Sequence, residues 1–374
     1  MSEQVGLGVI GCGGFGLFAL QQFVQTPGVH LVGMAGTARP AALAAAHRYG
    51  LKDVVEIDRL LEIGELDLVY IATPPFLHYE QAKRALAAGK HVICEKPLAM
   101  TVQQADELLS LARQKDRLLV ANLMQRYNPV FDLVGEVVKR QLLGEFLHGY
   151  FENYASDENL PPEHWFWDRE KSGGIFIEHG VHFFDLFAGW LGQGQVVSAQ
   201  SSRRENSPCE DQVQCSVSYA RGAHVNFYHG FHQPGRLDRQ ELRLVFERGD
   251  ITLHGWVPTS VRIHAIADEA QTRQLCELFA GARVDVLALH GGAERLCFSH
   301  GRQHDVYQQF DLHWGEQQQK LPLYCKLLRR MMADQVAWIQ DRSHRRTITE
   351  QNGRDSVAMA CDADRLAASV NRST

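Results

Sequence analysis

The sequence lacks closely spaced cysteines, long apolar runs and an excess of positive charge. None of its eight cysteines forms a C-x-x-C pair, which argues against a zinc ribbon or a disulfide framework and predicts buried, reduced thiols. The longest apolar runs fall well short of the roughly 20 residues that span a bilayer, so we expect no membrane partner. A formal net charge of −6 without a basic stripe argues against nucleic acid as a partner.

The N-terminus also lacks the features of a signal peptide. The stretch MSEQVGLGVIGCGG has no basic segment and runs directly into an expected strand. Together with the reduced cysteines, this predicts a cytoplasmic protein. No internal repeat or low-complexity tract is visible in the 374 residues, of which 45% are hydrophobic, enough for more than one domain.

The first third of the chain alternates short apolar runs with segments of helical periodicity. The expected strands are Val5–Ile10, Val29–Met34, Asp67–Ala72, His91–Cys94 and Leu118–Ala121. The expected helices are Phe15–Gln25, Ala41–Tyr49, Phe76–Ala88 and Thr101–Gln114. This alternation predicts an α/β domain whose parallel sheet is covered on both faces, with ligands at the carboxyl ends of the strands.

After Asn128-Pro129 the pattern becomes a series of strands joined by short turns. The expected strands are Glu145–Tyr154, Gln195–Ser202, Gln212–Tyr219, Ala223–Phe231, Glu241–Phe246 and Ile251–His254. The expected helices are Ile175–Leu191, Leu323–Ile339 and Glu350–Ser369. This pattern predicts an α+β domain with an open, mostly antiparallel or mixed sheet. Residues 263–319 give no clear pattern.

A glycine-rich turn follows the first expected strand. Gly11, Gly13 and Gly16 form G-x-G-x-x-G, with Gly14 and Phe15 inside the motif, where the first helix begins. The first glycine permits the tight turn, the second lets the backbone approach a pyrophosphate, and the third lets the helix pack closely. In this strand–turn–helix context the motif predicts dinucleotide binding. The alternative is a tight turn that binds no ligand.

The first part of the chain has no carboxylate where NAD-binding domains usually have one. An acid about 20 residues beyond the glycines normally holds the ribose hydroxyls of NAD. Here no Asp or Glu lies between Glu3 and Asp53, and Thr37 and Arg39 stand in its place. An arginine there suits a 2′-phosphate, which favours NADP, with NAD as the alternative. The alternative to a cofactor contact is an arginine in an exposed loop that binds no ligand.

The segment after 172–174 combines an apolar helix with a polar stripe. Within IFIEHGVHFFDLFAGWL, Glu178, His182 and Asp185 recur at intervals of four and three, which places them on one face. Burying such groups unpaired costs roughly 2–7 kcal/mol each, so they need a ligand, water or partners. A carboxylate one turn from a histidine suits a general base. A structural hydrogen-bond network is the alternative, and a metal site using His179 and His182 lacks a third ligand.

Several motifs together resemble the glucose–fructose oxidoreductase and inositol dehydrogenase family (Gfo/Idh/MocA). Gly89–Pro97 looks like its G-K-H-V…E-K-P signature, and Gly173–Asp185 is similar to G-G-x-x-x-D-x-G-x-H-x-x-D. The upstream Ala72–Pro75 with His78, and Asn122–Pro129 with Arg126, fit its usual pattern. These motifs span the chain to about residue 190, with weaker similarity after Ile348.

The resemblance implies roles for three residues. In the family, the lysine matching Lys96 contacts the substrate hydroxyl, and the histidine matching His182 is the usual acid/base. A residue before proline is pushed to extended geometry, so Lys96 should leave the strand end beside the nicotinamide position. Glu178 departs from the common family Asp, which leaves its role the least certain of the three.

The resemblance also completes the list of candidate site residues. For the cofactor we expect contacts from Gly11, Gly13, Gly14, Phe15, Gly16, Thr37, Arg39, Thr73, Pro74, His78, Glu95 and Lys96. For the substrate we expect Arg126, Trp165, Trp167, Asp168 and His179, each of which could equally be a packing residue. We expect no bound metal.

The expected architecture is a Rossmann-type domain over residues 1–125 and a substrate-binding and oligomerisation domain over 126–374. The last helix is a candidate for packing back toward the first domain. The expected reaction is hydride transfer between NADP and a hydroxyl carbon of a sugar, polyol or related compound bound between the domains. The family resemblance also implies a homo-oligomer (a dimer or tetramer) built through the open face of the second sheet. A cofactor-retaining glycosidase and a non-catalytic NADP-sensing regulator are the rivals.

Overall fold

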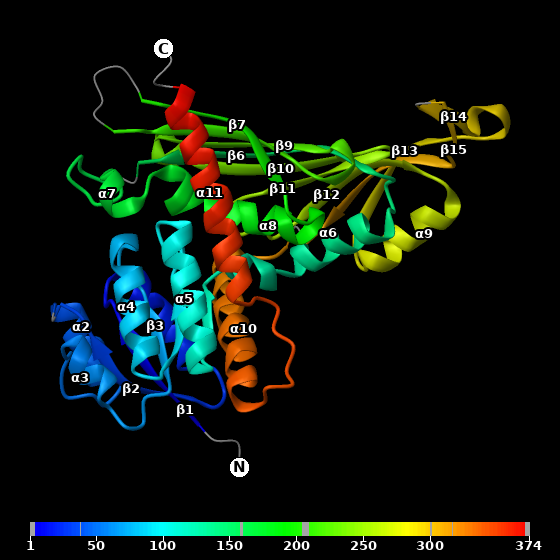
Figure 1. The fold of residues 1–374 in the computed structure, drawn as a ribbon. Coiled ribbons are helices and arrows are strands. Elements are labelled where there is room, and N and C mark those ends of the chain that lie inside the picture. Colours follow the sequence, from blue (N-terminus) through cyan, green and yellow to red (C-terminus); the bar gives the residue numbers. More distant parts are fainter. Residues whose placement is uncertain are drawn as a thin grey trace. The chain divides into compact units, whose positions relative to one another are not determined.

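The computed structural model describes residues 4–37, 39–157, 160–203, 209–299, 301–315 and 317–370. The chain divides into two compact units. The first unit comprises Met1–Tyr127, Pro161–Asp185 and Tyr324–Asp364, and the second comprises Asn128–Leu160, Leu186–Leu323 and Arg365–Thr374. Figure 1 labels their helices and strands, and each unit is described by itself.

A five-stranded parallel sheet forms the centre of the first unit, in the order β2-β1-β3-β4-β5. Its strands are β1 (Val5–Ile10), β2 (Val29–Ala35), β3 (Leu68–Ile71), β4 (His91–Cys94) and β5 (Leu119–Ala121). Every residue of β1, β3, β4 and β5 is buried, as in a sheet that is covered on both faces. The predicted α/β fold with a parallel sheet is confirmed.

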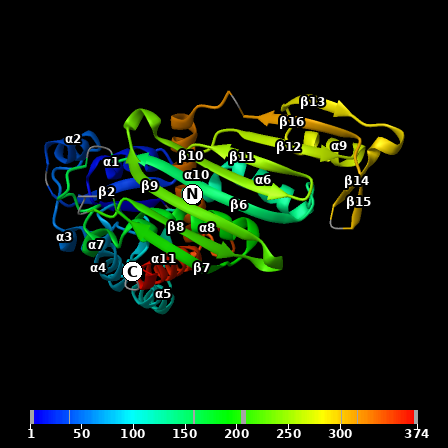
Figure 2. The same cartoon turned by 90° about the horizontal axis from the view of Figure 1, so that it is seen from above.

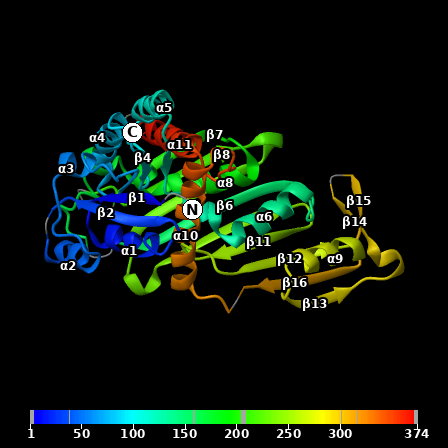
Figure 3. The same ribbon diagram turned by 90° about the horizontal axis from the view of Figure 1, so that it is seen from below.

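Helices alternate with these strands, and later segments of the chain complete the unit. The helices between the strands are α1 (Gly14–Phe23), α2 (Pro40–Arg48), α3 (Ile57–Leu61), α4 (Pro75–Ala87) and α5 (Val102–Lys115). The later segments are a 3-10 helix (Met124–Tyr127), α7 (Arg169–Ser172) and a π-helical turn (Phe176–Gly180). Parts of three longer helices also belong to the unit: the start of α8 (Val181–Leu191) and most of α10 (Lys320–Gln340) and α11 (Glu350–Val370). Figure 3 shows α4 and α5 together on one side of β1, with α1 and α10 near each other on the other side.

Two side-chain contacts attach the last helices to the parallel sheet's own helices. Arg329 Nη1 on α10 donates to Gln22 Oε1 on α1 at 2.6 Å. Arg354 Nε on α11 donates to Asp106 Oδ1 on α5 at 2.8 Å. Within the first unit, the C-terminal part of the chain therefore packs on helices that lie more than 200 residues earlier in the sequence.

The second unit is built on a nine-stranded mixed sheet, which confirms the expected α+β pattern. The strand order is β13-β16-β12-β11-β10-β6-β9-β8-β7, and β6 and β9 pair in parallel while the other neighbours are antiparallel. The strands in Figure 2 are β6 (Phe146–Ser156), β7 (Gln195–Ser202), β8 (Gln212–Ser218), β9 (His224–Gln233), β10 (Arg239–Phe246), β11 (Gly249–His254), β12 (Val261–Ala267), β13 (Arg283–Leu289) and β16 (Gln308–Trp314). Helices α6 (Pro129–Arg140) and α9 (Glu269–Leu278) also belong to this unit.

The region that gave no clear pattern, 263–319, contains most of one edge of this sheet. It holds part of β12, all of α9, β13 and β16, and a separate two-stranded sheet of β14 (Leu296–Ser299) and β15 (Arg302–Asp305). In β13 no residue is buried, so the strand lacks the alternation of apolar and polar residues that identifies a half-buried strand.

The expectation of buried cysteines was wrong in part. Cys12, Cys94 and Cys215 are buried, but Cys276 on α9 and Cys297 on β14 are exposed. Both exposed thiols lie on elements that bury few side chains. Leu275 is the buried residue of α9, and β14 belongs to a sheet of two strands. Among the described residues, no helix is long and apolar enough to cross a membrane, and no three His, Cys, Asp or Glu side chains are grouped to hold a metal ion.

Candidate functional site

The glycine turn between β1 and α1 requires glycine at two of its positions. Gly11 has a φ of +98°, and a Cβ there would lie 2.6 Å from the carbonyl carbon of Ala72. A Cβ at Gly16 would lie 2.2 Å from the carbonyl oxygen of Gly11. The chain therefore turns tightly against the end of β3, and α1 packs closely on the turn.

The other two glycines of the turn face open space. Gly13 is the N-cap of α1 and Gly14 is its first residue. No atom of the described residues lies within 4 Å of the position that a Cβ would take at either glycine. The first amides of α1 are thus open to a ligand, and the residues present fit the pyrophosphate of a dinucleotide.

The loop after β2 lies next to this turn and is exposed. The position of a Cβ at Gly36 is 3.6 Å from the backbone nitrogen of Gly11. Thr37 and Arg39 follow, both exposed, and the Arg39 N–H donates to the Thr37 carbonyl at 2.8 Å at the start of α2. The predicted pair therefore stands beside the glycine turn with its side chains open to solvent.

The residues after β3 form hydrogen bonds that fix their own loop and connect it to the loop after β4. Thr73 Oγ1 donates to Gln81 Oε1 at 2.7 Å, and Pro74 is the N-cap of α4. The ring of His78 is fully buried, with Nε2 2.7 Å from the Thr73 carbonyl oxygen and Nδ1 2.7 Å from the Pro97 carbonyl oxygen. In this structure His78 joins the loop after β3 to the loop after β4.

Glu95 follows β4 and takes part in a polar cluster at the ends of three strands. Its Oε1 accepts from the hydroxyl of Tyr70 on β3 and from Asn122 Nδ2 at 2.7 Å, directly after β5. Burial raises the pKa of Glu95, although both hydrogen bonds act in the opposite direction. Neither Tyr70 nor Asn122 was among the predicted site residues.

Lys96, the next residue, is bound by Glu178 from the π-helical turn. Its Nζ donates to Glu178 Oε1 at 2.6 Å and to the Glu178 carbonyl oxygen at 2.8 Å. The side chains are only 17% and 10% exposed. The Lys96–Pro97 peptide bond is cis. The structure thus brings together Lys96 and Glu178, two of the three predicted catalytic residues. The Glu178 carboxylate, which we expected to orient His182, instead binds Lys96.

His182 lies one turn beyond Glu178, at the beginning of α8. Its side chain is buried. Burial lowers the pKa of His182 well below its usual value, and the nearby charge of Lys96 acts in the same direction. The imidazole is therefore neutral at neutral pH and able to accept a proton.

The third member of the polar stripe, Asp185, pairs with Arg126. The guanidinium donates through Nε at 2.7 Å and Nη2 at 2.9 Å to the two carboxylate oxygens, and Asn352 Nδ2 donates to Oδ1 at 3.2 Å. Both charged side chains are largely buried. Arg126, predicted as a substrate contact, is thus bound to the helix that carries His182.

The remaining predicted substrate residues lie around α7 and the π-helical turn. Asp168 caps α7 through a hydrogen bond from the Glu170 N–H at 3.0 Å and pairs with Lys171. The Trp165 and Trp167 rings both contact the ring of Phe166, at centroid distances of 6.2 and 4.7 Å. The His179 ring lies 5.7 Å from that of Phe183.

The residues that sequence reasoning missed differ in the signal they offered. Asn122 follows β5 directly, and the rule that ligands bind at the carboxyl ends of parallel strands could have found it. Tyr70 lies inside a buried apolar strand, and Asn352 lies 167 residues from its partner Asp185, so neither had a local signal.

Two family models match consecutive parts of the chain. Residues 5–123 match the model described as oxidoreductase family, NAD-binding Rossmann fold. Residues 131–252 match the GFO/IDH/MocA C-terminal domain. Together the two matches cover more than half of the chain.

A curated relative and two solved structures add detail. The chain is 30% identical over 185 residues to dTDP-3,4-didehydro-2,6-dideoxy-alpha-D-glucose 3-reductase of Actinomadura kijaniata, covering 48% of this chain and 54% of that protein. It thus spans about half the length of this relative. Levoglucosan dehydrogenase in complex with NADH has a TM-score of 0.75 at 18% identity, covering 98% of each chain. Biliverdin reductase from Synechocystis in complex with biliverdin and NADP+ has a TM-score of 0.70 at 19% identity, covering 97% of this chain and 99% of that one. At these identities the two structures show a shared fold.

Proposed function

Because the chain belongs to the Gfo/Idh/MocA family of oxidoreductases, we propose that it transfers a hydride between NADP and a hydroxyl carbon of a sugar, polyol or related small molecule. The observation that carries this proposal is the buried Lys96–Glu178 pair at the end of β4, with His182 one turn further along the chain. The nicotinamide supplies the hydride acceptor or donor when it is bound.

In this proposal, Lys96 and His182 have different roles at the substrate hydroxyl. The neutral His182 imidazole accepts the hydroxyl proton during oxidation and returns it during reduction. The Lys96 ammonium, positioned by two hydrogen bonds to Glu178, donates to the oxygen on which negative charge develops. Glu178 thereby keeps the lysine oriented.

The substrate class is proposed from the relatives. One is named as a reductase of a dTDP-linked deoxysugar and one fold neighbour as a levoglucosan dehydrogenase, whereas another is a biliverdin reductase. The polar groups around Lys96 suit hydroxylated compounds, which hydrogen-bond well to charged donors.

The preference for NADP is proposed from Thr37 and Arg39. A carboxylate there would repel a 2′-phosphate, and the sequence has none between Glu3 and Asp53. The exposed Arg39 guanidinium offers paired donors that suit phosphate oxygens. Because exposure weakens such bonds, we expect NADP to bind about 10–100-fold more tightly than NAD.

Titration of both cofactors into wild type and Arg39→Ala tests this preference. Arg39→Ala should weaken NADP binding and leave NAD binding nearly unchanged. Arg48→Ala is the matched control, because Arg48 is an exposed arginine at the other end of α2. Equal or tighter binding of NAD by the wild type would contradict the preference.

A cofactor-reduction screen over sugars and polyols tests the reaction itself. We expect at least one hydroxylated substrate to reduce NADP at a rate that depends on its concentration. Release of free sugar from a nitrophenyl glycoside without net NADPH formation would identify the glycosidase instead. Binding of NADP without turnover of any compound would identify the regulator.

We also propose a homo-oligomer formed through the open face of the second sheet. That face has a hollow of about 380 Å³, and its lining includes Tyr150, Tyr154, Gln214 and Tyr228. Light scattering on the purified protein should give the mass of a dimer or tetramer. Tyr228→Arg should shift the mass toward that of the monomer.

A further inference from the structure

Helix α10 runs alongside α1 in the same direction. Near the start of α10, the Tyr324 ring lies 5.5 Å from the ring of Phe18. Further along, Arg329 donates to Gln22. Near the end, Gln340 Nε2 lies 3.2 Å from the position of a Cβ at Gly28. Because α1 begins at the glycine turn, this alignment places Tyr324 beside the first turns of α1.

Tyr324 belongs to an aromatic cluster at the edge of the open turn. Its ring lies 6.3 Å from that of Phe15, which in turn lies 6.1 Å from Phe18. Phe15 is the second residue of α1 and is 37% exposed, although aromatic side chains are usually more deeply buried. The cluster therefore borders the open space next to Gly13 and Gly14, which the first amides of α1 face.

A second observation places Tyr324 toward the strand ends as well. Burial and the Glu95 carboxylate raise the pKa of Tyr70, and the Tyr324 phenol is close enough to add to this effect. Tyr70 donates to Glu95 at the end of β4. Tyr324 is thus near both the N-terminus of α1 and the polar cluster at the carboxyl ends of the strands, between which a dinucleotide extends in this fold.

We propose that Tyr324 is a cofactor-contacting residue whose phenolic hydroxyl donates a hydrogen bond to the pyrophosphate of the bound dinucleotide. A phenol combines a rigid ring, which the aromatic cluster holds, with one donor that suits a charged phosphate oxygen. The inference rests on the proposed dinucleotide site and assigns to it a residue more than 300 positions beyond the glycine turn.

Isothermal titration of Tyr324→Phe with NADP+, NAD+ and ADP-ribose tests the proposal. Phenylalanine keeps the ring and removes only the hydroxyl, so all three dissociation constants should rise by about 5–20-fold. Arg39→Ala should affect NADP+ alone, because it addresses the 2′-phosphate. Tyr79→Phe is the matched control, since Tyr79 lies on the surface of α4 and its hydroxyl binds Glu107.

The outcomes separate a hydrogen bond from packing. Unchanged binding of all three ligands by Tyr324→Phe would overturn the proposal, even if Tyr324→Ala bound them weakly, because the ring alone would then matter. A loss for the dinucleotides with normal binding of ADP-ribose would also overturn it, because ADP-ribose contains the pyrophosphate. A wild type that binds none of the ligands would instead refute the dinucleotide site. Equal melting temperatures of wild type and Tyr324→Phe without ligand would exclude a folding defect.

Discussion

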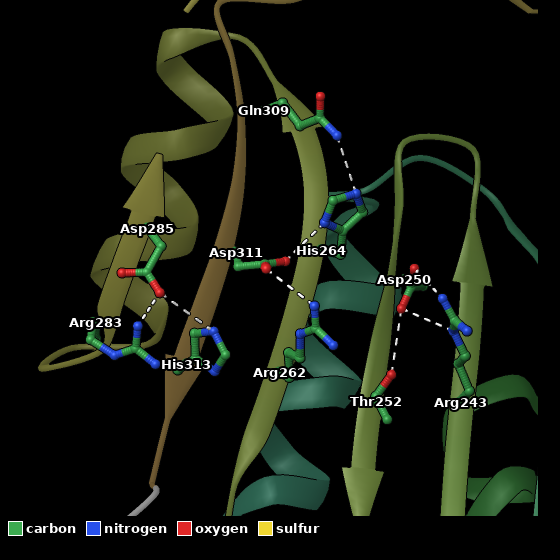
Figure 4. A network of polar contacts seen from close by, with 10 residues as sticks. All are labelled: Arg243, Asp250, Thr252, Arg262, His264, Arg283, Asp285, Gln309, Asp311 and His313. Atoms are coloured by element: carbon green, nitrogen blue, oxygen red, sulfur yellow. Dashed lines mark hydrogen bonds and ion pairs between the residues drawn. The ribbon is translucent and has the colours of Figure 1, made fainter. Parts of the chain in front are cut away.

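Charged side chains are used differently in the two units. In the first unit the two pairs at the candidate site are largely buried and join distant parts of the sequence. Lys96 and Glu178 are 82 residues apart, and Arg126 and Asp185 are 59 residues apart. In the second unit, the charged pairs of Figure 4 lie on neighbouring strands of one sheet, as Arg243 of β10 and Asp250 of β11 illustrate, or within one strand, as Arg283 and Asp285 of β13 do.

The network in Figure 4 is a ladder of acids flanked by bases across five strands. Asp250 accepts from Arg243, Asp311 accepts from Arg262 and lies 2.8 Å from His264 Nδ1, and Asp285 pairs with Arg283 and His313. Thr252 and Gln309 complete the set. The arginines of this ladder are 42–53% exposed, whereas Arg126 is 12% exposed.

The difference in burial decides what each pair contributes. An exposed pair gains little because water screens it and two long side chains lose freedom. A buried pair has already lost its hydration, so removing one partner leaves an uncompensated charge. We therefore expect the same substitution to have a large effect in the first unit and a small effect in the second.

The largest effect should come from Lys96 and His182. Lys96→Ala should reduce turnover by orders of magnitude while the cofactor still binds, and His182→Ala should lose about 10²–10⁴-fold, the usual contribution of an acid/base group. Glu178→Gln should lose less, because orientation survives while charge does not. Steady-state kinetics on the substrate found in the screen would measure this, with Lys83→Ala on the surface of α4 as control. Near-normal turnover by both alanine variants would refute the assignment.

The next largest effect concerns the buried pair beside the site. Arg126→Met should reduce the free energy of unfolding by about 3–5 kcal/mol, because the buried Asp185 carboxylate would lose its bidentate partner. Urea unfolding of the variant and wild type gives this value. A loss below 1 kcal/mol would show that burial does not distinguish this pair from those of the ladder.

Acid should affect both units, because each contains a buried histidine. Burial lowers the pKa of His229 to about 3 from 6.5, and burial with the charge of Arg117 lowers that of His91 to about 3. The unfolded chain then binds more protons below pH 6.5, so stability is lost as the pH falls from 6.5 toward 3. At pH 5 the loss relative to pH 7.5 should be about 2 kcal/mol for each histidine.

The variant His229→Leu tests this pH dependence. His91 is less suitable, because its Nδ1 accepts the Leu118 N–H at 2.9 Å and its removal would leave that donor unpaired. The difference in unfolding free energy between pH 7.5 and pH 5 should be about 2 kcal/mol smaller in His229→Leu than in the wild type. An identical pH dependence would mean that folding does not lower the pKa of His229.

The smallest effect should come from the ladder. Arg262→Met makes the same change as Arg126→Met, but the Arg262 side chain is 53% exposed, whereas that of Arg126 is 12% exposed. We expect it to cost less than about 1 kcal/mol, and less still at high salt. Urea unfolding at two salt concentrations would check this. A loss of several kcal/mol would show that the ladder acts as one cooperative network.

Much of the first unit could be predicted because its signals are local. Each strand is a short apolar run with polar or glycine boundaries, and the turn at Gly11 and Gly16 needs glycine for reasons of backbone geometry. The motifs around Lys96 and His182 were enough to indicate the family. In the second unit, β13 could not be read from the sequence, because an exposed edge strand carries no burial pattern.

The sequence by itself thus determined the order of the strands in the first third of the chain, the glycine turn and the residue types available for chemistry. Only the tertiary structure decided which groups meet: Glu178 holds Lys96, Asp185 holds Arg126, and Tyr324 reaches the start of α1. The physical reason is that hydrophobic periodicity and turn geometry act over a few residues, whereas these contacts join segments 59 to more than 300 residues apart. Their pairing depends on how helices and strands pack, which no short pattern in the chain encodes.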